Sequence, residues 1–250
     1  MRISAGAAAA AIKMKSMTER KRYLILVAGG SGTRMGGQVP KQFLETGGKA
    51  ILHHTIDKFT SAVRDLSIIT VLPEEWIDYW KSYCYRKNLV CRQVITAGGI
   101  TRFHSVKNAL GKVPDGVTAA VHDGVRPLLS EGMARRLFSL ADTFPAVVPV
   151  IPLVDTVKVL KKASGPQAGI YEAIPGETAD RTRLFGAQTP QVFHSEILKE
   201  AYSMPYSTEL TDDASVVERH GEKILYCTGE KYNIKITTPE DMGIAELLLK

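Results

Sequence analysis

The sequence predicts an α/β fold with one mostly parallel, Rossmann-like open sheet and helices on both of its faces. Three observations support this prediction. From residue 23 to residue 121, short apolar segments of strand type alternate with longer segments of helical periodicity. The first strand runs directly into a glycine-rich loop. The 250 residues are enough to bury one substantial core, so we expect a single domain over 22–250.

Strands and helices alternate regularly in the first half of the chain. Pro73 precedes the second predicted helix, and Phe103, Val106 and Leu110 share one face of the third. The predicted elements of this half are the strands 23–28, 66–72, 90–96 and 118–121 and the helices 51–61, 74–85 and 101–112.

The alternation breaks between Ala146 and Thr189. Strand-like pieces there are too short for a second domain, and a β excursion of this kind cannot bury much surface by itself. We therefore expect residues 153–180 to form a β-arm that packs on a second copy of the chain; a mobile flap over the active site is the alternative. The remaining predicted elements are the strands 147–151, 156–160, 169–174, 223–227 and 234–236, the helices 195–202 and 212–219, and a last helix from Pro239.

The formal net charge of +6 is concentrated at the N-terminus. Residues 1–22 hold six basic residues and one acidic residue, so the rest of the chain is close to neutral and has no broad basic face for nucleic acid. The stretch from Ala5 to Ile12 is short for a signal peptide and is followed by lysines. We interpret residues 1–21 as a disordered tail, with Met14 or Met17 as alternative translation starts.

Cysteine usage and hydropathy point to a reducing, cytoplasmic location. Cys84, Cys91 and Cys227 are odd in number and form no Cys-x-x-Cys pair, and the six histidines have no metal-ligand spacing. No stretch after the N-terminal tail reaches the roughly 18 apolar residues that a membrane span requires.

The segment from Leu26 to Gly36 has the composition of a phosphate-binding loop. Glycines let the backbone approach a ligand and turn its N–H groups toward an anion. Arg34 and the nearby Lys41 add positive charge, which a simple tight turn does not need. The residues expected at the phosphates are Ala28, Gly29, Gly30, Ser31 and Gly32.

Residue spacing excludes the two best-known phosphate loops. No Gly-Lys-Ser/Thr tripeptide occurs, so an ordinary ATPase or GTPase is not indicated. Met35 stands where the dinucleotide fingerprint has its third glycine. The remaining pattern, G-x-G-x-R-M-G followed by P-K, resembles the loop of nucleotidyltransferases that join a nucleoside triphosphate to a phosphorylated sugar or polyol.

A second polar segment, His122 to Pro127, follows the strand predicted at 118–121. Open α/β sheets bind ligands at the carboxyl ends of their parallel strands, so this segment is a second candidate for the site. The alternative is a turn in which Asp123 accepts backbone hydrogen bonds and Pro127 stiffens the exit.

Further motifs make a close family resemblance. Together with the glycine loop they resemble the 2-C-methyl-D-erythritol 4-phosphate cytidylyltransferases over about residues 22–250. The motifs are G-G-I-T-R-F-H-S (98–105), H-D-G-V-R-P (122–127), D-T-V (155–157), D-R (180–181), Q-T-P-Q-V-F (188–193), T-D-D-A-S (211–215) and N-I-K-I-T (233–237).

The resemblance implies a reaction and a role for each matching residue. A phosphate oxygen of the acceptor attacks the α-phosphorus of CTP and releases pyrophosphate, and Mg²⁺ neutralises the triphosphate. Arg34 and Lys41 match residues that stabilise the transition state, and Arg181 and Lys235 match residues that orient the acceptor. The implied nucleotide contacts are Gly98, Gly99, Arg102, Ser105, Asp123 and Gly124, with Asp123 also nearest the metal. The implied acceptor contacts are Arg126, Thr156, Arg181, Thr189, Thr211 and Lys235.

The chain departs from the family pattern at Ile100, where the family usually has an acidic residue. Several matched residues also have structural alternatives. Arg181 is a solvated loop cation if it is considered alone, and Lys235 suits a strand edge. Thr189 and Thr211 suit turn or N-cap positions.

Two other functions compete with this interpretation. Ribitol-5-phosphate cytidylyltransferases share nearly every triphosphate motif, although residues 101–108 and 211–218 are closer to the methylerythritol enzymes. A catalytically silent nucleotide-binding module on the same fold is the alternative outside enzymes, but Lys41 and Lys235 are both present.

Overall fold

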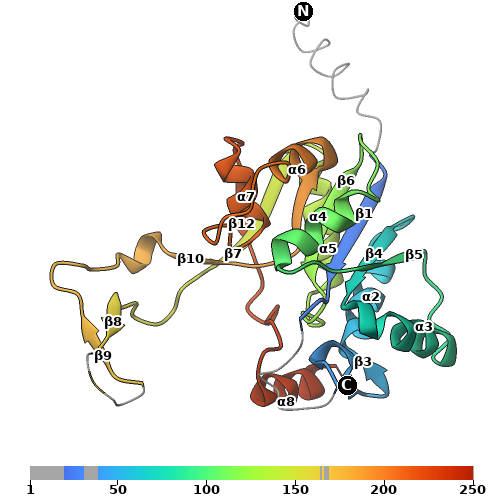
Figure 1. Ribbon diagram of the computed structural model, residues 1–250, viewed down its shortest axis with the longest axis horizontal. Coiled ribbons are helices and arrows are strands. Elements are labelled where there is room, and N and C mark those ends of the chain that lie inside the picture. The colour runs from blue at the N-terminus through green and yellow to red at the C-terminus, as the bar shows by residue number, and fades with distance from the viewer. Residues whose placement is uncertain (1–19, 31–38, 164, 166–168, 250) are drawn as a thin grey trace, which may run out of the picture.

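The computed structural model describes residues 20–30, 39–163, 165 and 169–249. The predictions for residues 1–19, Ser31, Gly32 and Arg34 lie outside these residues. Within them, eight strands form one sheet in the order β10-β7-β11-β6-β1-β4-β5, with β12 also paired to β7 (Figure 1). These strands are β1 Arg22–Val27, β4 Ser67–Leu72, β5 Gln93–Ala97, β6 Thr118–Asp123, β7 Ala146–Pro152, β10 Phe185–Ala187, β11 Gln191–His194 and β12 Leu225–Thr228.

The sheet is mostly parallel, as predicted. Strand β1 pairs in parallel with both β4 and β6, and the pairs β4–β5 and β7–β12 are also parallel. Strand β11 runs antiparallel between β6 and β7, and β10 runs antiparallel to β7. Strands β10 and β11 are absent from the predicted elements, because three or four residues are too few to show an alternating pattern.

Helices cover both faces of the sheet, which also confirms the prediction. Apolar side chains of α2, α3 and α5 pack on one face and those of α4, α6 and α7 on the other. The helices are α2 Ile51–Ala62, α3 Ile77–Arg86, α4 Arg102–Leu110, α5 Glu131–Ala141, α6 Ser195–Ala201, α7 Asp213–Arg219 and α8 Pro239–Leu248. Short 3₁₀ turns are η2 Lys41–Phe43, η3 Glu74–Trp76 and η4 Arg181–Arg183.

Strand β1 shows why the sheet needs both layers. Leu24 and Leu26 belong to the α2/α3/α5 layer and Ile25 to the α4/α6/α7 layer, and none of the three is exposed to solvent. A continuous apolar strand of this kind is stable only with both faces covered. Burying each such side chain contributes about 1.5–3 kcal/mol.

Helix α5 is absent from the predicted elements, although its sequence holds a recognisable start. The hydroxyl of Ser130 accepts a hydrogen bond from the backbone N–H of Met133, which is an N-cap arrangement. Met133, Leu137 and Phe138 then recur at helical spacing and are buried against the sheet. Helix α5 restores the alternation between β6 and β7.

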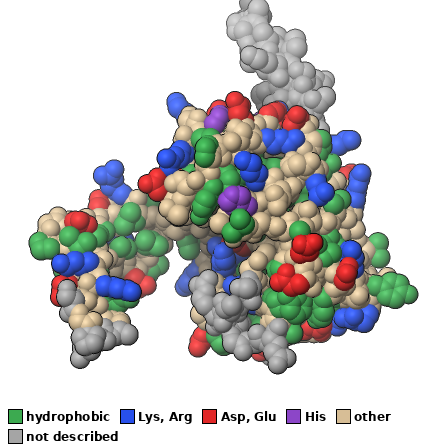
Figure 2. Space-filling model, in the orientation of Figure 1, with side chains coloured by type: hydrophobic (Ala, Val, Ile, Leu, Met, Phe, Trp, Pro, Cys, Tyr) green, Lys and Arg blue, Asp and Glu red, His purple; other side chains and the backbone are tan. Residues whose placement is uncertain are grey.

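The predicted β-arm leaves the body after β7 and returns through η4 to β10 (Figure 1). It contains a two-stranded antiparallel sheet of β8 Leu160–Lys162 and β9 Tyr171–Ala173, in which every residue is exposed. The first strand lies later than the predicted 156–160. Figure 2 shows hydrophobic side chains on the arm, which projects from the body on this face of the molecule.

Two other segments differ from the expectations. Residues 234–236 are not a strand: Ile236 donates its backbone N–H to the Val125 carbonyl, which ties a connecting segment to the loop after β6. Arg20, placed in the predicted tail, pairs with Glu196 at 2.8 Å, and the Lys21 carbonyl accepts a hydrogen bond from Thr118. A hairpin of β2 Glu45–Thr46 and β3 Lys49–Ala50 precedes α2.

Candidate active site

A cavity of about 510 Å³ opens where β1, β5 and β6 end and the chain enters the loops beyond them. These strands run parallel with β4 between β1 and β5, so their carboxyl ends lie at one edge of the sheet, the usual ligand site of open α/β folds. The structure brings together, among the predicted residues, Ala28, Gly29, Gly30, Lys41, Gly99, Arg102, Ser105, Asp123 and Lys235.

Gln42 fixes the start of the glycine loop through hydrogen bonds to its backbone carbonyls. Its side-chain amide is buried and donates hydrogen bonds to the carbonyls of Ala28, at 2.7 Å, and Gly30, at 3.2 Å. The N–H of Ala28 donates to Val71 of the neighbouring strand. Gln42 is not among the predicted site residues; its place next to Lys41 in the P-K-Q motif is the only sequence signal that marks it.

A second glycine pair follows β5 and closes the cavity beside α4. Gly99 donates its N–H to the Ser105 hydroxyl at 3.0 Å, and that hydroxyl donates to the Thr101 carbonyl at 3.0 Å. A side chain at Gly99 would place its Cβ 2.4 Å from Cβ of His104 and 2.9 Å from the carbonyl carbon of the same residue. Only glycine fits there without moving the first turn of α4. Ile100, next in the chain, is 96% exposed.

Asp123, at the end of β6, is surrounded by three cations. Its Oδ2 lies 3.1 Å from Nε of Arg126 and 3.2 Å from Nζ of Lys235, and its Oδ1 lies 3.6 Å from Nε of Arg102. Burial alone would raise the pKa of this carboxyl, but the charges of Arg102, Lys235 and Arg126 outweigh burial and hold the pKa well below its usual range. Asp123 is therefore ionised at neutral pH.

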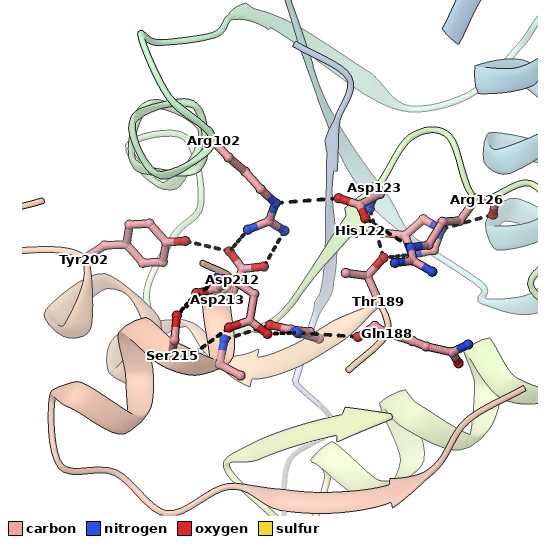
Figure 3. A network of polar contacts seen from close by, with 12 residues as sticks. Arg102, His122, Asp123, Arg126, Gln188, Thr189, Tyr202, Asp212, Asp213 and Ser215 are labelled. Atoms are coloured by element: carbon pink, nitrogen blue, oxygen red, sulfur yellow. Dashed lines mark hydrogen bonds and ion pairs between the residues drawn. The ribbon is translucent and has the colours of Figure 1, made fainter. Parts of the chain in front are cut away.

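Arg102 is held by a second carboxylate that lies deeper in the body. Its two terminal nitrogens contact Asp213 at 3.0 and 2.6 Å, and the Asp213 side chain is fully buried (Figure 3). Burial alone would lower the pKa of the guanidinium, but the two nearby carboxylates raise it, so Arg102 stays charged. Asp213 is not among the predicted site residues, although it lies in the T-D-D-A-S motif.

His122 and Thr189 form a buried support beneath Asp123. The Thr189 hydroxyl accepts from the backbone N–H of Asp123 at 3.1 Å and lies 3.0 Å from Nδ1 of His122. The other ring nitrogen of His122 lies 3.3 Å from the Arg126 carbonyl. Burial lowers the pKa of His122 to about 3, so the ring is neutral: Nδ1 accepts from Thr189 and Nε2–H donates to Arg126.

The loop carrying Lys235 is fastened to the sheet through Asn233. Its side chain donates to the Thr189 carbonyl at 2.8 Å, and its own carbonyl accepts from Arg126 at 2.8 Å. Lys235 thus reaches Asp123 from a segment more than one hundred residues away in sequence. The predicted contacts Gly98, Gly124, Arg126 and Thr189 adjoin the residues that line the cavity without lining it themselves.

Three further predicted acceptor residues also do not line this cavity. Thr156 and Arg181 are exposed on the arm, where Arg181 donates to the Val154 carbonyl at 2.5 Å. Thr211 is exposed in the loop before α7. Their assignment to acceptor binding stays a prediction, and for the arm residues it depends on where a second copy of the chain would place the arm.

The described residues contain no group of three or more His, Cys, Asp or Glu side chains arranged to hold a metal ion. None of the helices in this part of the chain is long and apolar enough to cross a membrane. The residues that line the cavity include the backbone of two glycine segments, several cations and the ionised carboxylate of Asp123. A strand-end cavity of that composition suits a phosphorylated ligand, as expected for an α/β enzyme of the nucleotidyltransferase class.

Comparisons with known proteins identify the family within that class. Residues 23–250 match the model of the IspD family, 2-C-methyl-D-erythritol 4-phosphate cytidylyltransferase, and the chain belongs to this family. Proteins of that name from Phocaeicola vulgatus and Porphyromonas gingivalis are 45% and 44% identical to it, over 91% and 92% of this chain and 99% of each relative.

Solved structures agree with the sequence relatives. The 4-diphosphocytidyl-2C-methyl-D-erythritol synthase of Anaerococcus prevotii superposes with a TM-score of 0.73 at 27% identity, covering 92% of this chain and 96% of that one. The 2-C-methyl-D-erythritol 4-phosphate cytidylyltransferase of Francisella tularensis has a TM-score of 0.73 at 28% identity, covering 91% and 99%. The predicted family resemblance is confirmed.

Proposed function

We propose that this enzyme transfers the cytidylyl group of CTP to 2-C-methyl-D-erythritol 4-phosphate, forming 4-diphosphocytidyl-2-C-methyl-D-erythritol and releasing pyrophosphate. Family membership favours this acceptor over ribitol 5-phosphate. The observation that carries the proposal is the meeting of both glycine segments with Lys41, Arg102, Asp123 and Lys235 around one cavity. A silent binding module does not need an acceptor-side cation facing the nucleotide loop.

The catalytic roles follow from where negative charge develops. An oxygen of the acceptor phosphate forms a bond to the α-phosphorus as the bond to the bridging oxygen of pyrophosphate breaks. Lys41 lines the cavity together with the glycine loop, and its proposed role is to stabilise charge on the α-phosphoryl group; Arg34 has the same proposed role from outside the described residues. Lys235 pairs with Asp123, and its proposed role is to orient the acceptor phosphate.

The nucleotide base is proposed to lie against the second glycine pair. Gly99 brings the backbone close to a ligand, and Ser105 together with Thr101 fixes the loop in that form. Exposed Ile100 supplies no polar side chain there, so contacts to the base come from the backbone and from Arg102.

Mg²⁺ is the proposed cofactor, and the donors present fit it. Asp123 is a single ionised carboxylate at the cavity, which suits an ion that takes most of its ligands from phosphate oxygens and water. Asp123 is the residue that would face a metal-bound triphosphate; its Oδ2 contacts Arg126 and Lys235, and its Oδ1 lies 3.6 Å from Nε of Arg102. When bound, the metal supplies charge neutralisation on the triphosphate.

A homodimer through the β-arm is the proposed assembly. Leu160 and Tyr171 are about half exposed on the arm, and a two-stranded sheet is marginal without a surface to cover it. Docking on a second copy would cover this apolar surface and would carry Thr156 and Arg181 away from their own chain. The three cysteines are unpaired thiols, which supports the proposed reducing, cytoplasmic location.

Pyrophosphate release from CTP tests the function. With Mg²⁺ present, 2-C-methyl-D-erythritol 4-phosphate and ribitol 5-phosphate are compared at equal concentration. We expect the first acceptor to be preferred by at least about two orders of magnitude in kcat/KM, because a site built to pair with its oxygens rejects an analogue that leaves them unpaired. A preference for ribitol 5-phosphate would reverse the acceptor assignment, and no release with either would favour the silent module.

A further inference from the structure

Asp213 is a buried carboxylate that contacts a cavity residue without reaching the cavity. Its side chain is 0% exposed, and it is the first residue of α7, on the far side of Arg102 from Asp123 (Figure 3). Arg102 donates to both of its oxygens, and the Tyr202 hydroxyl donates to Oδ1 at 2.6 Å. Asp213 is not among the residues that line the cavity.

A fully buried carboxylate is costly to desolvate and is retained only when its oxygens are paired. Here the pairing is a two-point contact with a guanidinium, which restricts the guanidinium in orientation as well as in position. Tyr202 is itself buried and stacks on Phe103 at 4.7 Å between ring centroids, so the donor to Asp213 is also rigid. Of these two side-chain partners of Asp213, Tyr202 is also held by ring packing, whereas Arg102 is held by its contacts with carboxylates.

The start of α7 is fixed independently of Arg102. The carboxylate of Asp212 caps the helix by accepting from the N–H of Ser215 at 2.8 Å. The Gln191 side chain donates to Asp212 at 2.8 Å and accepts from the N–H of Ala214 at 2.7 Å, which ties the helix to β11. These contacts direct Asp213 inward whether or not Arg102 is present.

We propose that Asp213 is a positioning residue of the nucleotide site: its two-point contact holds the guanidinium of Arg102 at the cavity wall and keeps it from closing on Asp123. Arg102 lies between two carboxylates, at 2.6 Å from Asp213 and 3.6 Å from Asp123. Without the Asp213 charge, Arg102 moves toward Asp123, the other carboxylate with which it pairs. Arg102 then no longer lines the cavity, and Asp123 is paired with Arg102, so neither side chain is available to the nucleotide. The inference rests on the nucleotide-binding role proposed for Arg102.

The test is Asp213→Asn, which keeps the side-chain size and removes the charge. The readouts are the equilibrium Kd of CTP with Mg²⁺ and no acceptor, then KM for each substrate. We expect the Kd and KM for CTP to rise about tenfold, with KM for the acceptor within about twofold of the unaltered enzyme, because a charge-assisted contact of this kind contributes a factor of ten or more. A CTP affinity unchanged by Asp213→Asn overturns the proposal.

A double variant separates positioning from general destabilisation. Arg102→Met removes the guanidinium that Asp213 is proposed to hold. Adding Asp213→Asn to Arg102→Met is therefore expected to cause no further change in the Kd of CTP. If the Kd of CTP in the double variant rises by the product of the two single-variant factors, Asp213 acts independently of Arg102, which would contradict the inference.

Ser215→Ala is the matched control on the same helix. It removes a capping hydroxyl without touching Arg102, so we expect a lower Tm and an unchanged Kd for CTP. If Ser215→Ala weakens CTP binding as much as Asp213→Asn does, the role of Asp213 is structural only.

Arg102→Lys keeps the test decisive if Asp213→Asn does not fold. Lysine retains the charge but cannot make the two-point contact, so CTP binding should weaken at a near-normal Tm, and unchanged binding overturns the inference. Failure of the unaltered enzyme to bind CTP would instead overturn the proposed function, and this inference with it.

Discussion

The charged side chains of the cavity wall around Asp123 are largely buried, whereas those of the β-arm are exposed to water. At the wall, Asp123 is 8% exposed in its side chain and pairs with cations from three separate parts of the chain. On the arm, Lys161 and Glu172 are both more than half exposed and lie 3.8 Å apart. The first arrangement holds each group in place and lowers the pKa of the carboxyl, whereas the second contributes little to stability because water screens it.

This difference suggests separate roles for the two regions in the proposed function. The proposed nucleotide side is built by residues of a single chain, and its supporting hydrogen bonds are buried or partly buried. The predicted acceptor residues Thr156 and Arg181 lie on a segment whose own hairpin strands have no buried residue. The comparison therefore predicts that substitutions in the two regions affect different substrates.

The largest effect is expected from Lys41→Ala. Loss of this cation from the glycine-loop side of the cavity should reduce kcat by about 100- to 1000-fold, because charge developing on the α-phosphoryl group loses a preorganised partner. Steady-state pyrophosphate release measures kcat, and circular dichroism checks that the fold is kept. Lys161→Ala on the arm is the matched control and should leave kcat unchanged. Normal turnover in a folded Lys41→Ala enzyme would remove Lys41 from the mechanism.

Arg181→Ala should act on the acceptor alone. We expect KM for 2-C-methyl-D-erythritol 4-phosphate to rise by about one to two orders of magnitude as a charge-assisted contact is lost, with KM for CTP nearly constant. Substrate titrations of pyrophosphate release give both KM values. Equal increases in the KM values of both substrates would contradict separate roles for the cavity wall and the arm.

Mixed dimers of Lys41→Ala and Arg181→Ala subunits sharpen that test. If the arm completes the partner's site, each mixed dimer contains one intact site, and with the acceptor well below its raised KM a statistical mixture recovers about a quarter of the normal activity. If Arg181 serves its own chain, every site carries a defect and nothing is recovered. The recovered rate after mixing and reassociation measures which is true.

Gly99→Ala should destabilise the cavity wall, whereas Gly186→Ala at the base of the arm should not. An added Cβ at Gly99 overlaps His104, while one at Gly186 would be 3.7 Å from its nearest neighbours, an ordinary contact. We expect the first variant to lose about 1–3 kcal/mol of unfolding free energy and to bind CTP more weakly. Thermal unfolding of both variants measures this, and equal Tm values would contradict the close approach of Gly99 to His104.

Stability should fall in mild acid because His122 is buried neutral. Its pKa is about 3 in the folded enzyme against 6.5 for an ordinary histidine, so the unfolded chain takes up the proton first. The unfolding free energy attributable to His122 is complete above pH 6.5 and is lost as pH falls toward 3, by up to about 1.4 kcal/mol per pH unit. Denaturant titrations between about pH 8 and pH 5 measure the slope. His122→Asn should flatten it, and an identical slope would show that other groups dominate.

The smallest effect is expected from Ile100→Asp. The side chain is 96% exposed beside the cavity, so Tm should not change. An acidic group there gives the nucleotide one more hydrogen-bond acceptor, and we expect KM for CTP to fall about threefold. A raised KM would show that the exposed apolar side chain itself contacts the nucleotide.

Local sequence patterns were enough to predict the first half of the sheet. Apolar runs such as 66–72 and the helical spacing of Phe103, Val106 and Leu110 depend on near neighbours, and the structure confirms both elements. The glycine loop and the polar end of β6 were predicted to share a site because carboxyl ends of parallel strands meet at one edge. Strands β10 and β11 carried too few residues for such a pattern, whereas 234–236 resembled a strand but forms a connecting segment.

The sequence was enough to predict the family, the sheet class and the residue types proposed to bind a triphosphate, since these follow from short motifs and their order. Only the tertiary structure decided that Gln42 holds the glycine loop, that Thr189 supports Asp123 and that Asp213 lies behind Arg102. Each of these contacts joins residues from different elements: Thr189 is 66 positions from Asp123, and Asp213 is 111 positions from Arg102. Chain packing brings such residues together, and no local spacing in the sequence encodes their distance.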